Sequence, residues 1–166
     1  MSLIRISPVA KPWQIKLLLV IYSSLIDIAF IMNHPRILVA EDTDFGQLII
    51  QQILSIMGID CTIVDNGQAV FDILKTEADY DLVLLDIEMP YINGLLAIKK
   101  IFSDYPDLSK KPIIATTGHK SKESHQTLIN AGFATVIYKP FTVEGFKTEL
   151  SKYLKVGMDT KEIKLT

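Results

Sequence analysis

Five short apolar runs alternate with longer helical stretches from residue 36 onward, and this alternation constrains the fold more than any other feature. The runs are rich in Ile, Val and Leu, which is typical of strands buried on both faces. They occupy residues 36–40, 60–64, 81–85, 112–116 and 134–138. The stretches that follow them carry apolar residues at helical spacing and occupy residues 44–57, 67–77, 94–104, 121–131 and 142–154. A βα unit repeated five times predicts a doubly wound parallel α/β sheet with helices on both faces.

Length and composition agree with one ordinary globular domain. The chain has 166 residues, 49% of them hydrophobic and 22% charged, with a formal net charge of −2. That balance argues against a nucleic-acid-binding surface. The single cysteine, Cys61, cannot form an internal disulfide, which fits a reducing compartment and predicts a cytoplasmic protein. The three histidines lack metal-ligand spacing, so zinc is not expected.

The amino-terminal residues 1–33 differ from the rest of the chain. Residues 17–32 are apolar except for two serines and Asp27, and three interpretations stay open. Translation could begin at Met32, which would make residues 1–31 an upstream artefact, or the segment could be an extra helix packed on the domain or on a second copy. A membrane anchor is least favoured, because the preceding basic residues would export everything that follows. The expected organisation is this extension, a domain over residues 34–155 and a short tail over residues 156–166.

Polar side chains stand at the carboxyl ends of four of the five expected strands. Glu41 and Asp42 follow the first strand, Asp86 the third, Thr117 the fourth and Lys139 the fifth. Each residue alone would be read as a helix cap, a turn residue or a surface lysine. In a parallel sheet, however, these strand ends meet at one edge. Clustered carboxylates repel one another unless a cation joins them, and all-oxygen ligands suit Mg²⁺.

The same edge has the groups that phosphoryl transfer needs. An aspartate can act as a nucleophile and form an aspartyl phosphate. A lysine and a threonine hydroxyl offer an incoming phosphoryl group a positive charge and a hydrogen-bond donor. The strand-end residues therefore predict a Mg²⁺-dependent phosphoryl site centred on Asp86.

Residues 35–154 resemble the receiver domain of two-component response regulators. The resemblance lies in four segments, RILVAEDT, LVLLDIEMPYINGL, PIIATTGH and VIYKPF. It implies the flavodoxin-like strand order 2-1-3-4-5. It also implies that Asp86 accepts a phosphoryl group from a phosphohistidine, that Thr117 hydrogen-bonds this group and that Lys139 pairs with it. A cis peptide bond before Pro140 is implied as well.

The resemblance further implies a metal site and partners. Asp42, Asp86 and the backbone carbonyl of Glu88 would bind Mg²⁺, with Glu41 acting mostly through water. The donor would be a sensor histidine kinase or a histidine phosphotransfer protein, and the product a changed surface for a downstream protein. We therefore expect a stand-alone signalling switch that is not an enzyme beyond its own phosphoryl transfer and autodephosphorylation. Nucleic acid and membrane are not expected partners, and a homodimer is left open.

One position departs from the family pattern. Many receivers have an aromatic residue three positions before the lysine, and Val136 stands there in this chain. The nearest aromatic, Tyr138, should point to the opposite side of its strand from Lys139. We therefore expect the output to rely on the loop after Thr117 and on the polar helix at residues 121–131.

Two other classes with a similar fold were weighed. A haloacid-dehalogenase-like phosphatase also uses a strand-end aspartate nucleophile with Mg²⁺, but it generally has a second aspartate two residues on, where Glu88 stands. A flavodoxin-like FMN carrier needs a first loop that cradles a phosphate. The acidic loop at residues 41–44 would repel one.

Overall fold

The computed structural model describes residues 35–154 together with Lys16. The expectations for the amino-terminal extension and the carboxyl-terminal tail lie outside the described residues. None of the helices in this part of the chain is long and apolar enough to cross a membrane.

The domain is built on a five-stranded parallel sheet in the order β2-β1-β3-β4-β5. This confirms the predicted fold class and strand order. The strands are β1 (Arg36–Ala40), β2 (Asp60–Val64), β3 (Leu82–Asp86), β4 (Ile113–Thr117) and β5 (Thr135–Tyr138). Because β3 is the central strand and is buried at all five positions, its last residue is held on the most rigid part of the scaffold.

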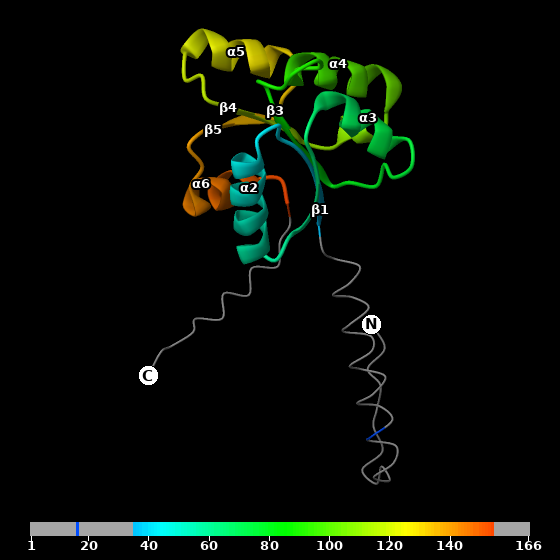
Figure 1. Cartoon of the computed structure of the whole chain (residues 1–166), viewed down its shortest axis with the longest axis vertical. Coiled ribbons are helices and arrows are strands. Elements are labelled where there is room, and N and C mark those ends of the chain that lie inside the picture. Colours follow the sequence, from blue (N-terminus) through cyan, green and yellow to red (C-terminus); the bar gives the residue numbers. More distant parts are fainter. Residues whose placement is uncertain (1–15, 17–34, 155–166) are drawn as a thin grey trace, which may run out of the picture. The chain divides into compact units, whose positions relative to one another are not determined.

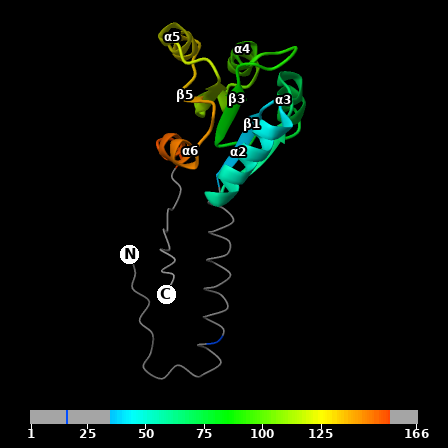
Figure 2. The ribbon, with the colours of Figure 1, turned by 60° about the vertical axis from the view of Figure 1, so that its left-hand side comes forward.

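Helices cover both faces of the sheet (Figures 1 and 2). They are α2 (Asp44–Ile56), α3 (Gly67–Leu74), α4 (Gly94–Asp104), α5 (Lys122–Asn130) and α6 (Val143–Leu150), with a short 3₁₀ turn at Leu108–Lys110. The helices α3, α4 and α5 pack on one face, and α2 and α6 pack on the other.

A polar side chain caps the amino terminus of each of these α-helices. In every case its oxygen accepts a hydrogen bond from the backbone N–H three residues later, which satisfies one of the unpaired donors at the helix start. The caps are Thr43, Asn66, Asn93, Ser121 and Thr142. Since these helices begin just beyond the carboxyl ends of the strands, the caps also fix the short loops at that edge of the sheet.

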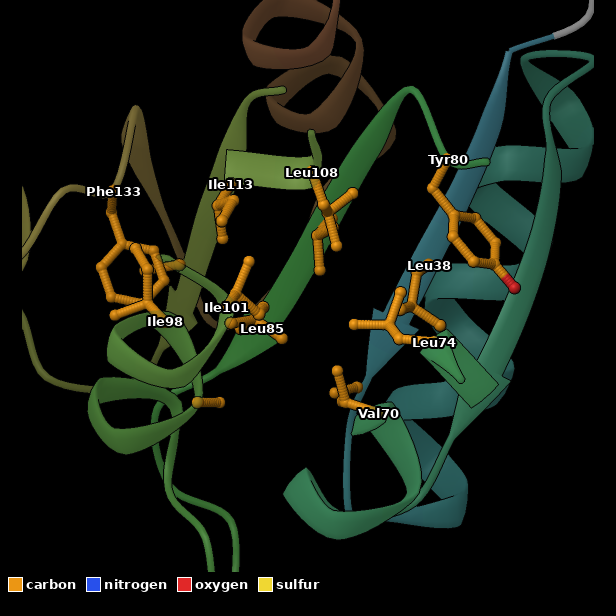
Figure 3. Close-up of a cluster of buried hydrophobic side chains, with 14 of the residues drawn as sticks. Leu38, Val70, Leu74, Tyr80, Leu85, Ile98, Ile101, Leu108, Ile113 and Phe133 are labelled. Atoms are coloured by element: carbon orange, nitrogen blue, oxygen red, sulfur yellow. The ribbon is translucent and has the colours of Figure 1, made fainter. Parts of the chain in front are cut away.

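Two apolar clusters hold the layers together. The larger lies under α3, α4 and α5, and Figure 3 shows side chains from α3, α4 and β3 meeting in it. The smaller lies under α2 and α6. Alternating residues of β3 enter the two clusters, Val83 and Leu85 on one side and Leu82 and Leu84 on the other.

Helix α2 has apolar residues on its outer face as well as its inner one. Ile50, Ile53 and Leu54 are buried against the sheet, whereas Phe45 and Ile56 are 73% and 71% exposed. Helical spacing in the sequence does not separate these two sets, because the apolar residues of α2 are spread around more than one side of the helix. Only packing against the sheet decides which set is buried.

We expect Leu85→Ala to lower the free energy of unfolding by about 2–5 kcal/mol, because Leu85 on β3 is fully buried and its loss leaves a cavity. Urea denaturation measures the change. Leu96→Ala is the matched control, since Leu96 is 53% exposed on α4 and its truncation should cost roughly 0.5 kcal/mol or less. Equal losses in the two variants would contradict the described burial.

Candidate functional site

The predicted site residues come together at the carboxyl edge of the sheet. Asp86 is the last residue of β3, and Thr117 is the last residue of β4. The sequence predicted that each of these strands ends one residue earlier, so both residues lie within their strands and not after them. Glu41 directly follows β1, and Lys139 directly follows β5. Glu41 and Asp86 are almost completely buried, which makes their charges dependent on what lies around them.

Lys139 forms the central contact of the site. Its Nζ lies 2.6 Å from Asp86 Oδ2 and 2.8 Å from Glu41 Oε2. Burial lowers the pKa of the Lys139 ammonium group, but the hydrogen bonds to Asp86 and Glu41 outweigh this, so the pKa is raised above its ordinary value. The lysine therefore stays charged at neutral pH and ties the ends of β1, β3 and β5 to one another.

Three carboxylates cluster at this point, and the lysine pairs with two of them. Glu41, Asp42 and Asp86 each offer an oxygen atom, and these oxygens all lie within 4.8 Å of one another. Within the described part of the chain, no cationic side chain lies at ion-pair distance from Asp42. Three negative charges facing one positive charge fit a divalent cation, and a set made only of oxygen ligands fits Mg²⁺ better than a softer metal.

The loop between β1 and α2 holds the Glu41 side chain in the site. Thr43 Oγ1 donates a hydrogen bond to Glu41 Oε1 at 2.6 Å and accepts one from Gly46 N at 3.1 Å. A Cβ atom at Gly46 would overlap the Glu41 carboxylate and the Thr43 hydroxyl, so a larger residue would displace Glu41 from this position. Sequence analysis missed Thr43 and Gly46. A glycine three positions after a cap residue, inside a helix where it costs stability, is the signal that could have found them.

The loop after β3 orients the Asp86 carboxylate. Glu88 N donates to Asp86 Oδ1 at 3.0 Å, and the Glu88 side chain turns toward the loop after β4. There it pairs with the His119 ring and accepts a 3.4 Å hydrogen bond from Gly118 N. His119 is a further neighbour of the site that the sequence did not single out, because no spacing rule connects it with Glu88.

Thr117 lies at the edge of the site and forms no hydrogen bond with Asp86. Its Oγ1 accepts a hydrogen bond from His119 N at 3.1 Å, which shapes the turn that leads toward α5. The peptide bond between Lys139 and Pro140 is cis, which confirms that expectation.

Tyr138 points away from Lys139 and toward α5. Its hydroxyl lies 2.9 Å from His125 Nδ1 on that helix, whereas the Lys139 amine lies with Asp86 on the other side of the strand. Val136 is buried on the same side as Tyr138, in the cluster under α3, α4 and α5. The expected direction of Tyr138 is therefore confirmed.

Comparison with known proteins identifies the family of this chain. The family model of the response regulator receiver domain matches residues 37–151. A chemotaxis protein CheY homolog of Campylobacter jejuni is 31% identical over 125 residues, covering 74% of this chain and 94% of that protein. The chain belongs to the family of response regulator receiver domains, the phosphoryl-accepting modules of two-component signalling.

Sensor kinases that carry such a domain are also similar. The aerobic respiration control sensor protein ArcB of Escherichia coli is 29% identical over 118 residues, which cover 71% of this chain but 15% of ArcB. The receiver domain of a sensor histidine kinase from Pseudomonas aeruginosa, solved with a magnesium ion in its active-site cleft, matches with a TM-score of 0.65 and 25% identity. That match covers 72% of this chain and 97% of the solved chain.

We expect Asp42→Asn to raise the stability of the protein in metal-free buffer by roughly 1 kcal/mol, because it removes one of three repelling carboxylates. The same variant should lose most of the rise in melting temperature that Mg²⁺ gives the wild type. Thermal unfolding with EDTA and with Mg²⁺ measures both effects. An unchanged response to Mg²⁺ would show that Asp42 does not hold the ion.

Proposed function

We propose that Asp86 accepts the phosphoryl group and that this modification switches the binding of a partner protein. The observation that supports this most is the Asp86 carboxylate itself. It lies at the end of the central strand, is buried, and is held by Lys139 from one side and by the Glu88 N–H from the other. A nucleophile fixed in this way needs little reorganisation before it reacts.

The transfer makes one bond and breaks one. A carboxylate oxygen of Asp86 attacks the phosphorus atom of a phosphohistidine, forming an O–P bond, while the P–N bond breaks and its electron pair stays on the imidazole nitrogen. Lys139 pairs with a phosphoryl oxygen, and the Thr117 hydroxyl donates a hydrogen bond to another. Autodephosphorylation is attack of water on the same phosphorus atom, which returns the Asp86 carboxylate.

Asp42, Asp86 and the backbone carbonyl of Glu88 would hold Mg²⁺, with Glu41 acting through water. The ion would offset the negative charge of the phosphoryl oxygens beside three carboxylates. The magnesium ion in the related kinase receiver supports this assignment.

The proposed donor is a sensor histidine kinase or a histidine phosphotransfer protein, working in the cytoplasm, where such donors are phosphorylated from ATP. The match to nearly the whole length of a CheY homolog supports a receiver that acts through a bound partner. A haloacid-dehalogenase-like phosphatase is not favoured. Glu88 occupies the position of its second aspartate, and the Glu88 side chain is paired with His119.

Incubation with Mg²⁺ and a small acyl phosphate should add one phosphoryl group to the wild type and none to Asp86→Asn, as read by intact mass. Asp107→Asn is the matched control, because the Asp107 side chain is 97% exposed in a salt bridge away from the site. It should react like the wild type. Equal gains in Asp86→Asn and wild type, or a gain that EDTA leaves unchanged, would contradict the proposed chemistry.

The output surface we propose is helix α5 with the end of β5. Leu128 is the only buried residue of α5, so the helix has little apolar anchorage, as expected of an element that moves. The hydrogen bond between His125 and Tyr138 joins α5 to β5, and Tyr138 is the register partner of Thr117 on β4. A shift of Thr117 toward a phosphoryl group would therefore reach α5 through both the loop and Tyr138.

Tyr138→Phe should increase amide hydrogen exchange in α5 roughly two- to tenfold, the range expected for the loss of one hydrogen bond. Mass-spectrometric exchange of the unphosphorylated protein measures the change. Tyr153→Phe is the matched control, because the Tyr153 hydroxyl donates its hydrogen bond to Ala134 O, outside α5. If both variants leave α5 unchanged, Tyr138 does not anchor the helix.

A further inference from the structure

Thr116, beside Asp86, has a buried hydroxyl that nothing in the site so far uses. The residue is 1% exposed, and its Oγ1 has no hydrogen-bond partner among the described residues. A buried polar group without a partner destabilises a fold, and apolar side chains of the same shape would avoid that cost. The presence of a hydroxyl group at residue 116 therefore needs a physical explanation.

The alternation of side chains places Thr116 on the reactive face of the sheet. Ile114, Leu84 and Ile137 all enter the cluster under α2 and α6. Two residues further along each strand, Thr116, Asp86 and Lys139 must point to the same side. The contact between Lys139 and Asp86 agrees with this placement. Thr117 points to the other side of β4 and accepts its hydrogen bond there from His119.

The register places Thr116 between the two charged groups. Asp86 and Thr116 are direct partners in the pairing of β3 with β4, and Thr116 pairs with Ile137 on β5. Neighbouring strands lie about 4.8 Å apart, so Lys139 must cross over β4 to reach Asp86. The Thr116 side chain stands on β4, on the face that the lysine crosses.

In the unphosphorylated site both Asp86 oxygens already have donors. Lys139 Nζ binds Oδ2 at 2.6 Å, and Glu88 N donates to Oδ1 at 3.0 Å. Once Lys139 pairs with a phosphoryl oxygen, it gives up its contact with the aspartate. The carboxyl oxygen that it leaves has lost its hydrogen-bond donor and, even as a ligand of Mg²⁺, has a second lone pair. The buried Thr116 hydroxyl beside it has no acceptor.

We propose that the Thr116 hydroxyl donates a hydrogen bond to the carboxyl group of Asp86 only after Asp86 is phosphorylated. This inference rests on the proposed function, and it assigns Thr116 a role separate from that of Thr117. The hydroxyl destabilises the resting state, where it has no partner, and stabilises the phosphorylated state, where it has one. It therefore shifts the equilibrium between the two states in favour of phosphorylation.

The test compares Thr116→Val, which keeps the side-chain shape without the hydroxyl, with Thr116→Ser, which keeps the hydroxyl. Beryllium fluoride with Mg²⁺ is the probe, because its beryllium atom attaches to a carboxylate oxygen and mimics a phosphoryl group. Melting temperature in buffer alone and affinity for the probe are measured on the full chain, with Asp86→Asn as the blank.

Thr116→Val should melt at a higher temperature than the wild type in buffer alone, yet bind the probe roughly two- to tenfold more weakly, the range expected for one hydrogen bond. Thr116→Ser should bind the probe within about twofold of the wild type. A purely structural hydroxyl would move only the melting temperature.

Two results would overturn the inference alone. One is equal affinity of Thr116→Val and wild type for the probe. The other is a lower melting temperature of Thr116→Val in buffer, which would show that the hydroxyl already has a partner. A wild type that does not respond to the probe any more than Asp86→Asn would overturn the proposed function, and this inference with it.

Discussion

The contact of Lys139 with Asp86 and Glu41 is the interaction on which the rest of the site depends. It joins residues from β1, β3 and β5 across the end of β4, so the edge of the sheet is held by charge as well as by backbone hydrogen bonds. One lysine does not neutralise three carboxylates. The remaining negative charge suits a divalent cation, and in the proposed function the lysine pairs with the phosphoryl group once it arrives.

The domain combines a rigid strand end at Asp86 with a weakly anchored helix, α5. Asp86 ends a strand that is buried at every position, and capped helices fix the loops around it. Helix α5 is the contrast, because it has one buried residue and a hydrogen bond from its His125 to β5. In the proposed function, a change of charge at Asp86 leaves the buried strand β3 in place and moves the loop after Thr117 and the helix that follows.

Sequence reasoning found the sheet and most of the site because both follow from short-range patterns. Apolar runs with Asp86, Thr117 and Lys139 at their ends predict parallel strands whose ends meet, and the structure brings these ends together. The strands β3 and β4 extend one residue further than predicted, because the apolar run stops before the backbone pairing does. Pairing of Asp86 with Thr116 is set by the neighbouring strand, which a single run of sequence does not contain.

The parts that sequence reasoning missed mostly depend on contacts between distant segments. The partnerless hydroxyl of Thr116 has no sequence signature, because a threonine in a strand is ordinary. The pairing of Glu88 with His119 joins two loops, and the exposed side of α2 is decided by which side the sheet covers. Gly46 is the exception, since a glycine inside the first turns of a helix lowers helix stability and so needs an explanation on sequence grounds alone.

A crystal structure of the protein with Mg²⁺ and beryllium fluoride tests the central claim most directly. It should show beryllium bonded to an Asp86 carboxylate oxygen, Mg²⁺ bound by Asp42, and Lys139 Nζ within hydrogen-bond distance of a fluorine atom. Beryllium fluoride on another residue, or Lys139 still holding an unmodified Asp86 together with Glu41 at saturating probe, would contradict it.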